Sequence, residues 1–543
     1  MSAIPSPDQI EPARLDEACS YPPSPNEDKE APAKLHRGLS SLHLQMIAFG
    51  GSIGTGLFVG SGKALASGGP LFLLIDLVLV GGILFTVIMA LGELATTLPV
   101  SGSLASYSTR MLDPAWGFAM GWIYWLLWLM VLPFELVVAT IVIRYWDVSE
   151  RITSAVWIVI FLTLICGINS VGIKGYATVE VVGSMIKIAA ILIFIFVAII
   201  IDVGGGPNHQ YLGAATWSEP GPTQNGFKGF CSVFVIAAFG YCGTELVGLA
   251  ARECENPRKE IPKASTQVFW RTVFFYIVSL FLIGLIVPSD HPKLMGDNNA
   301  SSSPFVIAFN IAGIKILPDI FNVVILVSVL SVGNSAIYGS SRTLVALAED
   351  GHAPKFLAHI DSKGRPVYAT GLSLAAGLLA FLQYASSQNL IFSWLLAVSG
   401  LGAIVTWGSV CAAHIRFRLA WARRGRSLEE LPWISPCGVW GSVIGLLSII
   451  LVLILVFFVS AFPIKPDPTV SGRVSFFFQN YISVPIIFSL FLWAKLKWKT
   501  SIRSLDEIDL DTGREQVPLE ILRAERDESK SRPLLQKLRE FVC

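Results

Sequence analysis

Residues 50–62 read GGSIGTGLFVGSG and lie inside an apolar stretch that runs from Leu44 to Ala66. The length and apolar character of this stretch predict a membrane-spanning helix. Glycine in a helix interior costs up to about 1 kcal/mol relative to alanine, and this segment accepts that cost repeatedly, with a serine and a threonine between the glycines. The pattern therefore indicates either unusually close packing of this helix or a local break in it.

The rest of the chain is also strongly apolar. Of its 543 residues, 53% are hydrophobic and 15% are charged, and the mean hydropathy is +0.62. An average soluble domain is about 25% charged. Long uncharged runs span residues 114–134, 152–173, 272–289 and 431–464, and each is long enough to cross a bilayer. We therefore predict an all-α polytopic membrane protein.

The uncharged runs divide the chain into about twelve predicted spans, with tails at both ends. The spans are 45–66, 71–97, 117–143, 155–173, 178–202, 229–251, 268–288, 316–348, 367–386, 389–414, 438–462 and 475–496. Residues 1–44 are rich in Pro, Ser and acidic side chains and predict a disordered tail. Residues 45–496 form the predicted twelve-helix domain, and residues 497–543 form the second tail.

Lysine and arginine are concentrated in alternate loops. The loop at 203–227 and the turn at 385–389 contain no Lys or Arg, and Arg144 and Arg151 are exceptions in the alternate loops. The other set of loops carries Arg110, Lys174, Arg252, Arg258, Lys259, Lys263, Lys355, Lys363, Arg365, Arg416, Arg418, Arg423, Arg424 and Arg426. Because basic loops stay on the cytoplasmic side, we expect both termini to be cytoplasmic.

Several function classes lack support in the sequence. The net charge is +1 and no basic arm is present, so we expect no nucleic-acid partner. The eight cysteines have no spacing typical of zinc or haem, and we expect no metal and no cofactor. The seven histidines include no HExxH-like pair and no nucleophile–base arrangement is evident, so we predict that the protein is not an enzyme.

Two interpretations of the GSIGTG segment remain open. Small residues four apart, as at Gly56 and Gly60, allow transmembrane helices to pack closely. Alternatively, the helix is unwound there, and its exposed N–H groups and the dipole of the following half-helix face an anionic ligand. A phosphate loop is excluded because the spacing fits neither GxGxxG nor a Walker motif.

A second interrupted span favours the unwound interpretation. Residues 238–245 read AFGYCGTE and again place glycine and polar residues inside an apolar helix. This span opens a second group of five, as GSIGTG opens the first group. Paired interruptions at corresponding positions are typical of transporters built from inverted repeats. We therefore predict a 5+5 inverted repeat with broken helices 1 and 6, followed by two extra helices.

Several long stretches resemble the fungal amino-acid permeases of the amino acid–polyamine–organocation superfamily. The resemblance runs from about residue 35 to residue 500 and includes LHRGLSSLHLQMIAFGGSIGTGLFVGSG, LPFELVVATIVIRYW, FKGFCSVFVIAAFGYCGTELVGLAARECENPRKEIPKA and TWGSVCAAHIRFR. It implies a multi-pass protein of the plasma membrane that imports amino acids together with protons by alternating access. The implied partners are the amino acid, protons and the lipid bilayer.

The resemblance assigns the substrate site to the two interruptions. Backbone amides of the first break would hold the substrate carboxylate, and they map to Ser52, Ile53, Gly54, Thr55 and Gly56. Carbonyls of the sixth helix would accept from the α-ammonium group, and they map to Phe239, Gly240 and Tyr241. Phe239 is either a gate over the substrate or a core aromatic residue. The family usually has a serine where this chain has Gly240.

Charged residues inside the spans are costly and indicate further roles. In proton-coupled relatives a lysine on the fifth helix lies beside the first break, and Lys187 matches that position. Because burial disfavours an ammonium ion, we expect Lys187 to release its proton during transport. Glu135 and Glu245 are expected at the substrate site, and a Glu245–Lys187 ion pair is an alternative. Asp76, Glu93 and Glu180 are interpreted as gate or structural residues.

The tails suggest regulation. Relatives often end in Phe-Trp-Cys with a palmitoylated cysteine, whereas this chain ends Phe541-Val542-Cys543, so Cys543 is a candidate lipidation site. Lys29 and Lys34 resemble acceptors for the ubiquitin ligase machinery. The alternative function is an amino-acid sensor or transceptor that keeps the permease fold.

Overall fold

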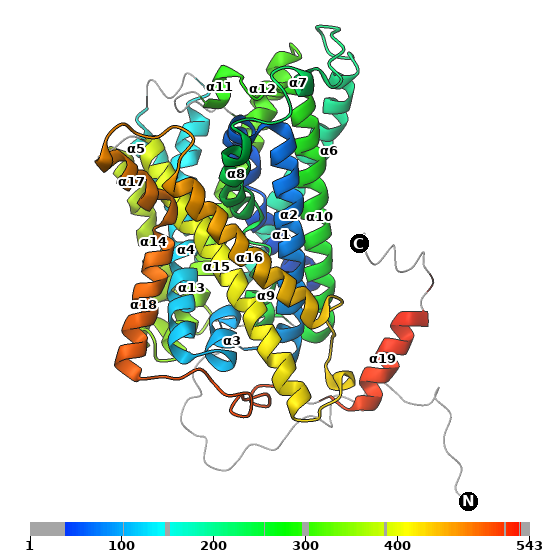
Figure 1. The fold of residues 1–543 in the computed structure, drawn as a ribbon, viewed down its shortest axis with the longest axis vertical. Helices are drawn as coiled ribbons and strands as arrows, with labels where there is room; N and C mark the ends of the chain where they lie inside the picture. The colour runs from blue at the N-terminus through cyan, green and yellow to red at the C-terminus, as the bar shows by residue number, and fades with distance from the viewer. Residues whose placement is uncertain are drawn as a thin grey trace, which may run out of the picture.

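A computed structural model shows a long bundle of helices (Figure 1). It describes residues 39–100, 102–146, 152–254, 256–295, 303–384, 388–514, 517–531 and 533. The regular structure of these residues is helical, apart from one isolated bridge between Leu39 and Cys254. The predicted all-α membrane fold is therefore confirmed. Lys29, Lys34 and Cys543, named above for the tails, lie outside the described residues.

The helices of the first half follow the predicted spans closely. They are α1 (Ser41–Ser52), a π-helical turn (Gly56–Gly60), α2 (Ser61–Thr97), α3 (Ser103–Met111), α4 (Pro114–Ile143), α5 (Ser154–Ser170) and α6 (Ile173–Asp202). Apolar sequence fixes where most of these helices lie. The starts are set locally, as at α4, where the Asp113 side chain accepts a hydrogen bond from the Ala115 N–H (2.8 Å) and Pro114 occupies the first turn.

The second half begins with α7 (Ala215–Ser218), α8 (Gly226–Tyr241), α9 (Leu246–Leu249), a 3-10 turn (Ala250–Arg252), α10 (Pro257–Ile286), α11 (Pro292–Met295), α12 (Pro304–Ile311) and α13 (Leu317–Glu349). It continues with 3-10 turns at Lys355–Ala358 and Leu428–Glu430, α14 (Val367–Ala376) with its 3-10 extension Gly377–Tyr384, α15 (Gln388–Arg423), α16 (Gly438–Ala461), α17 (Val470–Tyr481), α18 (Ser483–Trp498) and α19 (Leu519–Ser531).

Fewer than the predicted twelve membrane spans are found when helices are selected by their length and composition. In the described part of the chain, nine helical segments are long and apolar enough to cross a membrane, or ten if α17 and α18, which meet at a 67° bend, form one span. One of the nine, Ser41–Thr97, is 57 residues long and contains a kink at Gly69 (φ 79°, ψ 171°) between the first two predicted spans. The helix α5 is apolar but has only 17 residues. Twelve spans therefore stay a prediction.

The packing forms an inner set of helices and an outer set. The inner helix α4 packs against α13 and α15, while α2 packs against α8 and α10. Outer helices expose large apolar side chains, such as Val182 and Phe196 of α6 and Leu447 and Ile454 of α16. Exposed apolar faces of this kind suit contact with lipid.

The C-terminal segment, defined here as residues 499–514, lies at the same end of the bundle as α3, opposite α7, α11 and α12 (Figure 1). It is attached to the basic end of α15 by ion pairs. Arg423 pairs with Asp506 (2.7 Å) and Arg426 with Asp511 (2.8 Å). Exposed ion pairs are individually weak, but Ile508 and Leu510 are also fully buried. This packing docks the segment against the bundle.

Candidate functional site

Both predicted interruptions are present. The helix α1 ends at Ser52, Ile53 is extended (φ −94°, ψ 101°), and helical structure resumes at Gly56. The helix α8 ends at Tyr241, and α9 begins at Leu246 after a short non-helical segment. The sequence produces the second break through Gly243, whose φ of 106° is one that side-chain-bearing residues rarely adopt.

The two breaks touch each other through their backbones. A Cβ atom on Gly56 would lie 2.5 Å from the Gly240 Cα, and one on Gly243 would lie 2.6 Å from the Gly51 carbonyl carbon. Tyr276 of α10 also joins them, because its hydroxyl lies 2.9 Å from the Ser52 carbonyl oxygen and 2.7 Å from that of Gly240. The glycines are therefore needed for close approach as well as for unwinding.

The first break presents unused hydrogen-bond donors. The Ile53 N–H donates to the Phe49 carbonyl (3.1 Å), but within the described residues nothing accepts a hydrogen bond from the backbone N–H of Gly54, Thr55 or Gly56. Unpaired N–H groups in a buried segment are costly, and at the start of a helical segment they favour an anion. This arrangement can hold a carboxylate.

The carbonyls of the second break are partly occupied. The Phe239 carbonyl accepts from the Cys242 N–H (3.2 Å), and the Tyr241 carbonyl accepts from the Thr244 hydroxyl (3.0 Å). The Gly240 carbonyl is the one that faces the Tyr276 hydroxyl. Each carbonyl oxygen has two lone pairs. A carbonyl oxygen that already accepts one hydrogen bond can therefore accept a second one from a substrate ammonium group.

A small cavity of about 10 Å³ lies between the breaks, which is the space of about one water molecule. Its lining includes Ser52, Gly54, Thr55, Gly56, Glu135 and Phe239 from the sequence prediction, together with Gly51, Trp128, Val131, Cys242 and Val332. Ile53, Gly240, Tyr241, Glu245 and Lys187 do not line it. The structure therefore brings six of the predicted residues together around one space.

Glu135 joins the first break to α4. Its Oε2 accepts a hydrogen bond from the Thr55 hydroxyl (2.5 Å), while its Oε1 is buried without a partner among the described residues. The neighbouring Phe134 meets the Phe239 ring edge to face at a centroid distance of 5.2 Å. The free carboxylate oxygen can accept from a cation that enters the cavity.

Lys187 and Glu245 have separate partners. The Lys187 Nζ of α6 donates to the Gly50 carbonyl (2.5 Å) and to the Ser331 hydroxyl (3.0 Å). The Glu245 Oε2 accepts from the Gly243 N–H (3.0 Å) in its own break. The alternative Glu245–Lys187 ion pair is therefore wrong, because the short-range contact within the break holds the Glu245 carboxylate in place.

Glu93 belongs to a structural contact. Its carboxylate lies 2.6 Å from Arg418 and 3.1 Å from His414, and it accepts from the Ser435 N–H (2.6 Å). The Glu93 side chain has no solvent exposure. Charged groups that are buried and fully paired in this way hold elements together, in agreement with the structural role suggested by the sequence.

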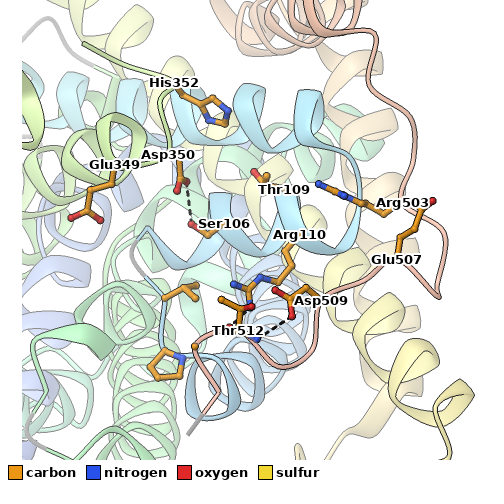
Figure 2. A pocket seen from close by; sticks show the side chains of 13 residues that line it. Ser106, Thr109, Arg110, Glu349, Asp350, His352, Arg503, Glu507, Asp509 and Thr512 are labelled. Carbon is orange, nitrogen blue, oxygen red and sulfur yellow. Dashed lines mark hydrogen bonds between the residues drawn. The ribbon is translucent and has the colours of Figure 1, made fainter. Parts of the chain in front are cut away.

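A second pocket of about 700 Å³ lies between α3, the end of α13 and the C-terminal segment (Figure 2). Arg110 donates to the Thr512 carbonyl (2.8 Å), and the Ser106 hydroxyl faces Asp350 (3.5 Å). Burial acts to raise the pKa of Asp509, but hydrogen bonds from Thr512 and Asp511 outweigh it and lower that pKa to about 2. The lining mixes both charges and includes no residue of the predicted substrate site.

Comparison with known proteins agrees with the geometry. Residues 43–507 match the family model described as "Amino acid permease". The chain is 47% identical over 508 residues to the general amino-acid permease GAP2 of Candida albicans, covering 92% of this chain and 85% of the relative. It is 45% identical over 528 residues to the general amino-acid permease GAP1 of Saccharomyces cerevisiae, covering 95% and 86%. It is 47% identical over 500 residues to the amino-acid permease inda1 of Hypocrea atroviridis, covering 91% and 87%.

Proposed function

Because this chain belongs to the amino acid permease family, we propose that it imports amino acids across the plasma membrane by proton symport with alternating access. The observation that carries the proposal is the pair of facing breaks, which offers free N–H donors at Gly54 to Gly56 and an unpartnered carboxylate oxygen on Glu135. A zwitterion needs donors at one end and acceptors at the other, and this cavity supplies both within one space.

In the proposed complex the α-carboxylate accepts from the N–H groups of Gly54, Thr55 and Gly56. The α-ammonium group faces the carbonyl of Phe239, a residue that lines the cavity, whereas Gly240 and Tyr241 do not line it. The Phe239 ring covers the bound amino acid. The free oxygen of Glu135 completes the acceptor set for the ammonium group or for a cationic side chain.

The size of the cavity supports alternating access. A space of about 10 Å³ is far smaller than any amino acid, since one water molecule already needs about that much. Substrate entry therefore requires the two breaks and the surrounding helices to separate. A transporter that opens to one side at a time moves in this way.

Lys187 is the proposed proton-coupling group. It is fully buried, and it links the carbonyl of Gly50, next to the first break, to Ser331 of α13. Loss of its proton changes the charge beside the segment that holds the substrate carboxylate. No contact among the described residues favours the sensor alternative.

The test is uptake of radiolabelled amino acids in permease-deficient cells, with and without a protonophore. We expect concentrative uptake that collapses with the proton gradient, whereas a sensor would give no flux. Uptake that is unchanged by the protonophore would contradict proton symport.

A matched pair of variants tests the lysine. Lys187→Met is expected to abolish accumulation while the protein still reaches the cell surface. Lys174→Met, which removes an exposed lysine from the same helix, is expected to behave like the wild type. Normal accumulation by Lys187→Met would exclude the coupling role of this lysine.

A further inference from the structure

A buried acid and a buried base on α6 are connected through a third helix. The Lys187 Nζ donates to the Ser331 hydroxyl of α13 (3.0 Å), and the Ser331 hydroxyl donates to the Glu180 Oε2 (2.7 Å). The second oxygen of Glu180 accepts from the Asn334 side-chain amide (2.7 Å). The side chains of Glu180 and Lys187 have no solvent exposure. Seven residues separate them, so they lie on one face of the helix, two turns apart.

The same pair packs against the first break. A Cβ atom on Gly50 would lie 2.6 Å from the Glu180 Oε2, and the Gly50 carbonyl accepts from the Lys187 Nζ (2.5 Å). The other titratable groups that face the pair are Glu135 of α4, near Lys187, and Tyr176 of α6, near Glu180. A change in the charge of Glu180 or Lys187 therefore changes the electrostatic potential at the Gly50 backbone, which leads directly into Gly54.

We propose that Glu180 and Lys187, joined by the Ser331 hydroxyl, form one two-residue site that binds the transported proton. This inference rests on the proposed proton symport and names the group that shares the proton with Lys187. Sequence alone suggested a gate or structural role for Glu180. In the structure Ser331 connects Glu180 to the Lys187 ammonium group, which assigns Glu180 to the proton site instead.

The hydrogen bonds already point in the direction of a proton transfer. An N–H bond of Lys187 breaks as a new O–H bond forms on Ser331, while the original Ser331 O–H bond breaks and a new one forms on the Glu180 Oε2. The ammonium group and the carboxylate, which Ser331 bridges, become a neutral amine and a carboxylic acid, and the total number of protons is unchanged. The vacated amine then accepts a second proton, which is the transported one, and the site carries a net charge of +1.

The positive charge explains why proton and substrate travel together. An unpaired charge inside the membrane is costly, so the doubly protonated site is unfavourable on its own. A substrate carboxylate at Gly54 to Gly56 brings a negative charge next to it and offsets part of that cost. Glu180 lies about 10 Å nearer than Lys187 to the start of α6, which is the cytoplasmic end in the predicted orientation. The proton therefore leaves from Glu180 toward the cytoplasm.

The experiment uses the full chain, purified and reconstituted in proteoliposomes, with a radiolabelled mixture of the protein amino acids. Two quantities are measured for each variant. The first is accumulation driven by an imposed pH gradient, and the second is counterflow exchange without a gradient, which requires substrate binding and helix movement but no net proton transfer.

Four variants separate the proton site from a structural role. Glu180→Gln removes the acid, and Ser331→Ala removes the bridging hydroxyl. Ser331→Thr keeps a hydroxyl at the same place. Ser328→Ala is the matched control, because Ser328 is also buried on α13 but, among the described residues, its hydroxyl donates only to the Val324 carbonyl of its own helix (2.8 Å).

We expect Glu180→Gln and Ser331→Ala to lose gradient-driven accumulation by about tenfold or more, corresponding to about 1.4 kcal/mol of coupling, while counterflow stays within about twofold of the wild type. Ser331→Thr should recover accumulation, and Ser328→Ala should match the wild type. The proposal is overturned if Glu180→Gln accumulates normally. It is also overturned if Glu180→Gln and Ser331→Ala both lose counterflow, because the contact is then structural.

The failure of this inference is distinguishable from the failure of the proposed function. If the wild type itself does not respond to the pH gradient, proton symport is wrong and the proton site is overturned with it. If the wild type responds and the Glu180 and Ser331 variants respond equally, only the two-residue site is wrong.

Discussion

Replacing Gly56 by alanine tests the contact between the two breaks. The added Cβ would lie 2.5 Å from the Gly240 Cα and 3.0 Å from the Gly240 N. Both of these atoms belong to the backbone, so no side chain can rotate away. Because ordinary contact begins near 3.4 Å and protein interiors are close-packed, the two segments must separate by about 0.9 Å.

The size of the effect follows from two opposing contributions. Overpacking of a buried site costs about 1–3 kcal/mol. Alanine restricts the unfolded chain more than glycine does, which returns about 0.4–1 kcal/mol. The difference between the middle values of these two ranges is about 1.3 kcal/mol, which falls on the geometry of the substrate site and corresponds to a factor of about 9.

Uptake of radiolabelled amino acids, normalised to the amount of protein at the cell surface, measures this effect. We expect Gly56→Ala to lose uptake by about fivefold or more. The control is Gly82→Ala on α2, where an added Cβ meets nothing within 4 Å and uptake should stay normal. Wild-type uptake by Gly56→Ala would refute the conclusion that close approach of the two breaks forms the site.

Three further predictions concern other parts of the molecule. Gly54→Ala should abolish uptake, because its Cβ would overlap the Val332 side chain and alanine favours helix where the break is needed; normal transport would refute this. Glu93→Gln should lower the free energy of unfolding of the purified protein by about 3 kcal/mol, because it leaves the buried Arg418 guanidinium without its counter-charge. An unchanged Tm would contradict the structural role of Glu93. Burial lowers the pKa of His352 below its ordinary 6.5, so the stability that its neutral form contributes is present above pH 6.5 and is lost as the pH falls below that value. Tm should therefore fall more on acidification in the wild type than in His352→Phe, and equal falls would argue against this effect.

The sequence predicted the features that depend on local composition. Apolar length identified most of the helices, and glycine together with polar residues identified both breaks. Thr55 and Glu135 were both expected at the site, and the structure places them in direct contact. The helices and the breaks are visible in the sequence because each depends on residues that are neighbours along the chain, whereas the family resemblance supplied the expectation for Thr55 and Glu135.

Features that depend on how helices face one another could not be predicted. The helix α4 is buried on nearly all sides, so its apolar pattern marks no preferred face, and Trp128 and Val131 were missed. Their spacing of seven and four residues from Glu135 puts them on one helical face and is the signal that could have found them. Tyr276 was missed because its bridge between the two breaks requires three helices to meet.

The partner of a buried charge was also beyond the sequence. Glu245 was expected to meet the substrate or Lys187, yet it bonds to an N–H group two residues away. Glu180 was interpreted as a gate or structural residue, and nothing in the chain indicated that Ser331, more than a hundred residues later, connects it to Lys187. The choice among such partners is made by tertiary packing.

Competition by substrate analogues tests the central claim, that the two breaks bind a zwitterion, most directly. In proteoliposomes, uptake of a radiolabelled amino acid is challenged with the same unlabelled amino acid, with its decarboxylated amine and with its deaminated acid. We predict that each analogue competes at least about tenfold more weakly than the parent amino acid, because each leaves one end of the site unpaired. If the amine competes as well as the parent, the free N–H groups of Gly54 to Gly56 do not hold the carboxylate, and the two breaks do not form a zwitterion site.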